Sequence, residues 1–393
     1  MGSGIFEGVP PDKNRCILLG IARLLLVSAL LMGCRGRSEV HIGLVVSYEA
    51  RRAATIAVDE LNRDAPPGAP RIVLSVPPYT PPSSAAPAIT IASGLAADDR
   101  VIAVVGHSNS SASLAAAPLY NRARLMHIAP TSTNRALRDA GDFTFTLVPN
   151  DELQARFIAG AVLASRPRRL GIVFVNDDYG RGLLNLIRPH LPADIATLEL
   201  PYRELPDSQE VNGTIDRAAA VKSNPFAATI DRLCSFGPDH LLWVGRPAPL
   251  GDFLDSIPAD LRRVPITGTD ALDAPLLYVN AGGRFTGVRF VRFVDPNSPR
   301  PRTVAIREAV RRSGSDFSSE AMLTYDAVRL IGHAIHHGAN TRTGVRNYVA
   351  RIGSTLPAYE GASGTIAFDE AGEVTRPYHL VAVTDSGVVV VNP

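Results

Sequence analysis

The stretch that decides the fold reads VIAVVGHSNSSAS and occupies residues 101–113. Its first five residues are apolar and rich in β-branched side chains, which predicts a buried strand at 101–105. A short polar turn follows, and small residues from Ala112 onward predict a helix over 112–123. A buried strand that leads through a polar turn into a helix is typical of a parallel sheet covered by helices.

The same alternation on both sides of this stretch predicts two sheets. Before a boundary near Pro149, strands are expected at 40–46, 72–76, 101–105, 125–128 and 143–148, with helices at 49–62, 89–98 and 112–123. The pattern then restarts, with strands at 170–175, 197–202, 240–244 and 264–267 and helices at 152–164, 182–190, 227–236 and 252–256. A Pro-rich linker at 295–301 precedes helices at 319–337 and 344–352 and strands at 364–368 and 379–391. We therefore expect an α/β protein with two Rossmann-like, doubly wound lobes.

The N-terminal segment has the layout of a signal peptide. Residues 24–33 form an apolar run that follows the cations Lys13, Arg15 and Arg23. The run is shorter than the roughly 20 residues that a membrane-spanning helix needs. The letters before Cys34 resemble a bacterial lipobox, which predicts that residues 1–33 are removed and that Cys34 carries lipid outside the cytoplasm. An ordinary signal peptide that happens to contain a cysteine is the alternative.

Composition narrows the class of protein. The chain has 393 residues, which favours two domains, and its 40 basic and 38 acidic residues leave a net charge of +2. This balance gives no field for nucleic acid binding. With Cys16 in the leader and Cys34 as the anchor, Cys234 has no disulfide partner, and we expect it to be buried at a helix end.

Five sequence blocks resemble the type I periplasmic binding proteins of the leucine/isoleucine/valine-binding family. They occur in the family's order at residues 104–113, 125–133, 170–182, 324–328 and 364–372. The resemblance implies two lobes joined by three crossovers, with the solute between them. It places the first lobe at 39–148 and 296–358, and the second lobe at 149–295 and 359–393.

The resemblance also implies a site for an amino-acid-like ligand. Ser110, Thr131 through its backbone and Thr133 would hold the carboxylate, because hydroxyls and free amides at a helix N-terminus suit an anion. Ser110 could instead only cap its helix.

Three second-lobe residues complete the expected site. Tyr179 would close over the ligand, or pack only within its turn. Asp270 would hold the ammonium group, or cap a loop. Arg246 stands where the family commonly carries an aromatic residue and would favour an additional anionic group if it faced the cleft; an exposed arginine is the alternative.

Two departures from the family pattern stand out. Val46 and Ser47 lead almost directly into Tyr48, so the usual loop after the first strand is short and one wall of the pocket is missing. Asn109 lies in the segment where many relatives carry a cysteine, so the small disulfide of the first lobe is absent.

Rival motifs are weak, and the expected function is non-covalent binding. No Gly-rich dinucleotide turn follows the first strand, and the only lysine after Cys34 is Lys222, outside any phosphate loop. His333, His336 and His337 suggest a metal face, although cationic residues also suit a helix C-terminus. We expect no metal or cofactor and a solute receptor that delivers its ligand to an ABC permease. A ligand sensor without a transporter, or an enzyme on this fold, are the alternatives.

Overall fold

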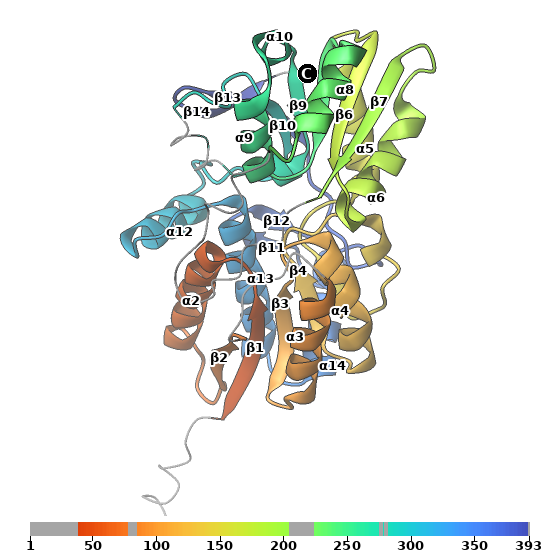
Figure 1. The fold of residues 1–393 in the computed structure, drawn as a ribbon. Helices are drawn as coiled ribbons and strands as arrows, with labels where there is room; N and C mark the ends of the chain where they lie inside the picture. Colours follow the sequence, from red (N-terminus) through yellow and green to blue (C-terminus); the bar gives the residue numbers. More distant parts are fainter. Residues whose placement is uncertain (1–37, 78–84, 204–223, 275–277, 279–281, 392–393) are drawn as a thin grey trace, which may run out of the picture.

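A computed structural model describes residues 38–77, 85–203, 224–274, 278 and 282–391. The predicted signal peptide and Cys34 lie outside these ranges. Two α/β lobes are stacked end to end, and the chain passes between them more than once (Figure 1). Within the described ranges, every helix is too short or too polar to cross a bilayer.

The first lobe is built on a five-stranded parallel sheet with the order β2-β1-β3-β4-β5. Its strands are β1 Glu39–Val45, β2 Arg71–Ser75, β3 Val101–Gly106, β4 Met126–Ala129 and β5 Thr144–Thr146. Its helices are α2 Tyr48–Arg63, α3 Ala85–Ala97, α4 Ser110–Arg122, the 3₁₀ turn η1 Arg135–Leu137, α12 Pro301–Arg312, α13 Ser319–His336 and α14 Arg342–Val349.

The central strand β3 explains why helices cover both faces of this sheet. Successive side chains of a strand point to opposite faces. Ala103 and Val105 belong to the core that contains α2 and α13, whereas Val104 belongs to the core that contains α3 and α4. All six residues of β3 are buried, as the apolar run predicts.

The second lobe has a seven-stranded sheet with the order β14-β13-β10-β9-β8-β6-β7, in which β13 and β14 are antiparallel additions. Its strands are β6 Arg169–Val175, β7 Ala196–Tyr202, β8 His240–Val244, β9 Ile266–Gly268, β10 Arg289–Arg292, β13 His379–Thr384 and β14 Gly387–Val391. Its helices are α5 Asp151–Leu163, α6 Asp178–Ile187, η2 Arg188–His190, α8 Ala227–Phe236, α9 Pro247–Ser256, α10 Ala259–Arg262 and η3 Asp270–Leu272. Trp243 and Phe290 lie at the centre of this lobe's core.

The third crossing between the lobes lies later than the predicted one near residues 359–364. The short strands β11 Tyr359–Gly361 and β12 Gly364–Ile366 form a hairpin. Ala362, Phe368 and Val374 belong to the core of the first lobe. The predicted boundary at residue 359 is therefore too early, because this apolar segment fills the first lobe before the chain reaches β13.

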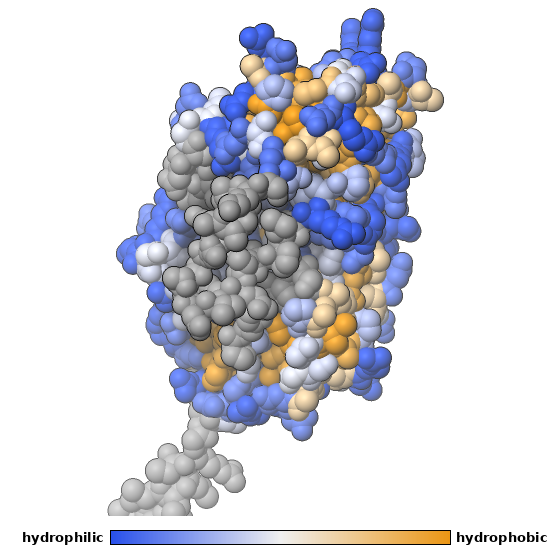
Figure 2. Space-filling model, viewed as in Figure 1, coloured by the Kyte–Doolittle hydropathy of each residue, from blue (hydrophilic) through white to orange (hydrophobic). Residues whose placement is uncertain are grey.

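Two further observations concern the surface. Cys234 is exposed, so the expectation of burial was wrong. Helix α8 buries Ile230 and Leu233, and the next position turns about 100° away from that face. Hydrophilic residues cover much of the visible face of both lobes, and apolar residues form separate patches (Figure 2).

Candidate functional site

A cavity of about 230 Å³ lies between the two lobes, and we call it the interlobe cavity. The first lobe lines it with Ser108, Asn109, Ser110, Thr131, Phe293, Ser319, Glu320 and Leu323. The second lobe lines it with Tyr179, Arg246, Pro247, Asp270, Ala271, Asp273 and Ala274. Of the predicted ligand-binding residues, all except Thr133 belong to this lining.

The N-terminus of α4 forms the hydroxyl-rich part of the cavity. The cap of this helix is Asn109, whose side-chain oxygen accepts a hydrogen bond from Ala112 N at 3.0 Å. Ser110 is 2% exposed and stands at the first helical position, so its hydroxyl is not the cap. The first amides of a helix have no partner within the helix, and the helix dipole is positive here. This end of the cavity therefore suits an anionic group.

Thr131 and Thr133 have different surroundings. Thr131 Oγ1 donates to the carbonyl of Ser108 at 2.6 Å, which leaves the Thr131 backbone as the group to face a ligand. Thr133 is buried, and its carbonyl accepts a hydrogen bond from Asp151 N at 2.8 Å at the first crossing. Thr133 is not among the residues that line the interlobe cavity.

Tyr179 and Asp270 meet in one buried network on the second lobe. The Tyr179 hydroxyl lies 2.6 Å from Asp270 Oδ1 and 2.6 Å from Thr269 Oγ1. Its single proton goes to the carboxylate, and the threonine hydroxyl can donate to the phenol oxygen. Gln154 Oε1 accepts a hydrogen bond from Asp270 N at 3.1 Å, so the site is tied to α5.

A second carboxyl group stands behind Asp270. Gln154 Nε2 donates to Asp151 Oδ1 at 2.9 Å, and Asp151 is fully buried. Burial raises the pKa of Asp151 well above its usual value, and the nearby Asp270 charge raises it further. Burial also raises the pKa of Asp270, to about 6. Asp270 is therefore ionised at neutral pH in a poorly solvated place, which suits a ligand's ammonium group.

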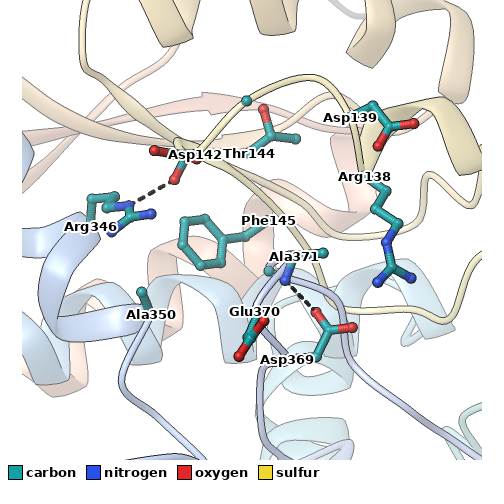
Figure 3. A pocket seen from close by; sticks show the side chains of 12 residues that line it. Arg138, Asp139, Asp142, Thr144, Phe145, Arg346, Ala350, Asp369, Glu370 and Ala371 are labelled. Carbon is teal, nitrogen blue, oxygen red and sulfur yellow. Dashed lines mark hydrogen bonds between the residues drawn. The ribbon is translucent and has the colours of Figure 1, made fainter.

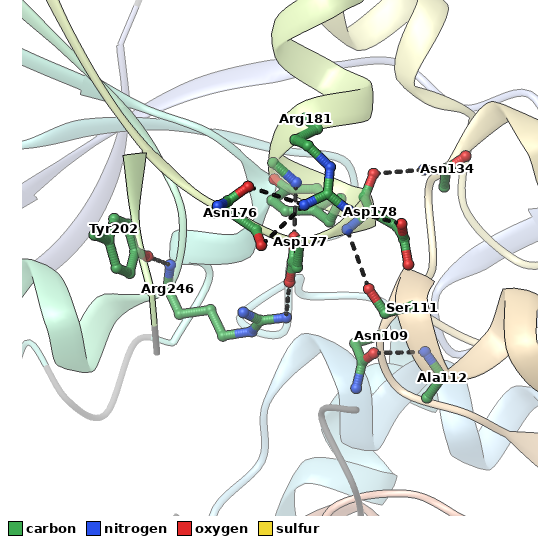
Figure 4. Close-up of polar contacts among 12 residues, drawn as sticks. Asn109, Ser111, Ala112, Asn134, Asn176, Asp177, Asp178, Arg181, Tyr202 and Arg246 are labelled. Atoms are coloured by element: carbon green, nitrogen blue, oxygen red, sulfur yellow. Dashed lines mark hydrogen bonds and ion pairs between the residues drawn. The ribbon is translucent and has the colours of Figure 1, made fainter. Parts of the chain in front are cut away.

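Arg246 lines the cavity and pairs with an acid of its own lobe. Its Nη2 lies 3.1 Å from Asp177 Oδ2, and its backbone N donates to the Tyr202 hydroxyl at 3.2 Å (Figure 4). Its charge is thus balanced within the lobe. The geometry does not call for the additional anionic ligand group that an unpaired arginine would favour.

The rim of the cavity joins the N-termini of two facing helices. Asp178 N, at the start of α6, donates to Ser111 Oγ at 3.3 Å (Figure 4). Asn134 Nδ2 donates to the carbonyl of Asp178 at 2.9 Å. These bonds connect the first lobe to the second, so the structure is a form in which the lobes touch beside the cavity.

Comparisons with known proteins agree with this architecture. A family model described as "Receptor family ligand binding region" matches residues 49–225. "Leu/Ile/Val-binding protein homolog 1" of Brucella abortus is 22% identical over 386 residues, covering 95% of this chain and 97% of that protein. The "Amino acid binding protein" of Pseudomonas aeruginosa is 31% identical over 259 residues, covering 64% of this chain and 65% of that protein.

A solved structure extends the likeness to the whole fold. The branched-chain amino acid transporter substrate binding protein of Streptococcus pneumoniae, in complex with isoleucine, matches with a TM-score of 0.74 at 19% identity, over 91% of this chain and 100% of that chain. The chain has the fold of the type I periplasmic binding proteins and is similar in sequence to proteins of the Leu/Ile/Val-binding family. The fold class predicted from the ordered sequence blocks is confirmed, and the comparisons support the predicted family.

Sequence reasoning missed two acids of the interlobe cavity. Asp273 Oδ1 accepts hydrogen bonds from Arg292 Nε at 2.9 Å and Nη2 at 2.5 Å, and Asp273 Oδ2 accepts one from the Ser319 hydroxyl. Glu320 Oε1 accepts hydrogen bonds from Ser47 N at 3.1 Å and from the Ser108 hydroxyl. The available signal for Glu320 was its place in the first turn of the helix predicted at 319–337.

Another cavity, of about 300 Å³, lies on the first lobe and is less suited to a ligand (Figure 3). Two of its charged side chains, Asp369 and Arg346, are committed to local structure. Asp369 Oδ1 accepts hydrogen bonds from Ala371 N and Glu373 N, each at 2.9 Å. Arg346 Nε donates to the carbonyl of Asp142 at 2.8 Å.

The histidines near the end of α13 also serve local structure. His337 Nδ1 lies 2.7 Å from the carbonyl of His333, and the two rings are 4.3 Å apart. A histidine that contacts a late carbonyl suits the C-terminus of a helix.

Proposed function

We propose that this protein captures a small amino-acid-like molecule in the interlobe cavity and delivers it to an ABC permease. The observation that carries the proposal is the pairing of opposite walls. The first lobe offers the N-terminus of α4 and the hydroxyl of Ser110, and the second lobe offers the carboxylate of Asp270. The groups of the first lobe are complementary to a ligand's carboxylate, and the carboxylate of Asp270 is complementary to its ammonium group. Tyr179 would cover the ligand and orient Asp270.

Binding would favour closure of the two lobes. A ligand that touches both walls contacts them together only when the lobes meet, so its binding free energy shifts the population toward the closed form. No covalent step is needed, and the ligand would be released unchanged. The relatives are binding proteins, and this supports binding over catalysis.

The place of action would be outside the cytoplasm. The signal-peptide layout supports export, and Cys34 would tether the mature chain to a membrane through lipid. A receptor that senses its ligand for another membrane partner would use the same cavity. Isolation of a complex with a permease would favour transport over sensing.

A thermal-shift screen of L-amino acids on protein lacking residues 1–34 tests the proposal. A ligand at 100 times its Kd should add about 2.7 kcal/mol to the free energy of unfolding and raise Tm. Ser110→Ala and Asp270→Asn should each weaken binding at least tenfold, since each removes a partner of a charged group. The exposed Ser235→Ala and Asp260→Asn are matched controls. Unchanged affinity in both cavity variants would refute the site.

A further inference from the structure

Glu320 is a cavity acid that the proposed function leaves unassigned. It stands in the first turn of α13, after the N-cap Ser318, and its side chain is half-buried in the lining. Its Oε1 accepts hydrogen bonds from Ser47 N and the Ser108 hydroxyl. Within the described part of the chain, no Arg, Lys or His forms an ion pair with Glu320, and Oε2 has no hydrogen-bond donor.

The other charges of the cavity are already balanced. Arg292, itself 3% exposed, neutralises Asp273. Arg246 pairs with Asp177. Asp270 is the acid assigned to the ligand's ammonium group. Glu320 therefore remains as an additional carboxylate, which becomes costly to desolvate when a ligand fills the cavity unless the ligand brings a positive charge.

The short connection after β1 places Glu320 in the cavity. Ser47 is the N-cap of α2, so only two residues, Val46 and Ser47, separate β1 from this helix. The Ser47 amide thereby reaches Glu320, and both stand beside Ser108 at the end of β3. Glu320 thus lines the cavity on the side where the loop after the first strand is short.

We infer that the ligand carries a second cationic nitrogen, held by Glu320, and is an amino acid with a basic side chain. This inference rests on the proposed function and specifies its substrate class. Phe293 and Leu323 line the same cavity and offer apolar surface to a methylene chain. Long basic side chains pack their stems on such surfaces and present the charged end to an acid.

Isothermal titration with L-lysine, L-ornithine and the neutral, similarly shaped L-norleucine tests the inference. Wild-type protein should bind lysine or ornithine at least tenfold more tightly than norleucine. Glu320→Gln keeps an acceptor for Ser47 N and Ser108 but removes the charge, and should reduce the preference to about threefold or less. Glu320→Leu should favour norleucine. Glu308→Gln, an exposed acid on α12, should leave the preference unchanged.

The outcomes separate this inference from the proposed function. If wild type binds norleucine or leucine as tightly as lysine and ornithine, the inference is refuted and the amino-acid receptor stands. If Glu320→Gln weakens all these ligands equally, Glu320 is structural and the inference is also refuted. If the folded wild type binds none of the amino acids, the proposed function fails, and the inference with it. The relative affinities of wild-type protein for lysine, ornithine and norleucine test the inference even if the variants do not fold.

Discussion

At the scale of single residues, Asp270, which we propose holds the ligand's ammonium group, belongs to a buried polar network. Tyr179 and Gln154 orient it, and the carboxyl group of Asp151 stands behind it. Burial raises the pKa of Asp270 to about 6. The ionised form attracts an ammonium group, and the protonated form does not. Ligand affinity should therefore be close to full at pH 7 and above, be about halved near pH 6 and continue to fall as the pH drops further.

We predict that the Kd of the tightest amino acid rises about tenfold between pH 7.5 and pH 5. The loss follows from the fraction of Asp270 that remains ionised at pH 5, because the ligand's own carboxylate and ammonium keep their charges over this range. Titration calorimetry at each pH measures the change. Asp270→Asn should bind weakly and show no such dependence. An affinity that stays level in wild type would contradict the role given to Asp270.

At the scale of elements, helices α4 and α6 meet end to end across the rim. The hydroxyl of Ser111 and the side chain of Asn134 hold the first residue of α6. Two helix N-termini are both positive, so their approach is unfavourable without such polar groups between them. These bonds belong to the form in which the lobes touch.

Ser111→Ala should weaken ligand binding through closure without touching the ligand. The lost hydrogen bond is worth about 0.5–1.5 kcal/mol, which corresponds to a decrease in affinity of about two- to thirteenfold. Small-angle scattering of the ligand-free variant should show a larger radius of gyration than wild type. Ser235→Ala on α8 is the control. A variant with wild-type affinity and dimensions would show that the rim bond does not contribute to closure.

The same scale shows what the sequence could and could not predict. Periodicity located β3, α4 and most other elements, because their burial is local and repeats along the chain. Glu320 and Ser108 are 212 positions apart, so no local pattern could bring them together. Thr133 resembled a binding residue by its position after β4, but it does not line the interlobe cavity, and its carbonyl bonds Asp151 N at the start of α5. The late third crossing was missed because residues 359–374 carry strand signals that suit either lobe.

At the scale of the whole molecule, Asp326 bonds residues 359–374, which we call the late segment, to the first lobe. This fully buried carboxylate accepts hydrogen bonds from Ala362 N and Ser363 N, both at 2.7 Å. Burial raises the pKa of Asp326, and these hydrogen bonds oppose that rise. The Thr324–Val328 block of the family resemblance therefore contains a structural acid.

Asp326→Ala should lower the free energy of unfolding by about 3–5 kcal/mol, because it leaves two buried amides without an acceptor. Urea denaturation followed by circular dichroism measures the loss. Asp316→Asn, an exposed acid in the loop before α13, should change stability by less than 0.5 kcal/mol. If Asp326→Ala unfolded at the wild-type urea concentration, the late segment would be held by its apolar contacts alone.

Because the chain crosses between the lobes three times, each lobe can complete its core only late in synthesis. The first core needs Phe368 and Val374, and the second needs Val381 and Val383. During synthesis, neither half can finish folding until nearly the entire polypeptide has left the ribosome. A nascent chain with two incomplete cores still exposes apolar surface that the finished fold buries, so it is prone to aggregation until synthesis is nearly complete.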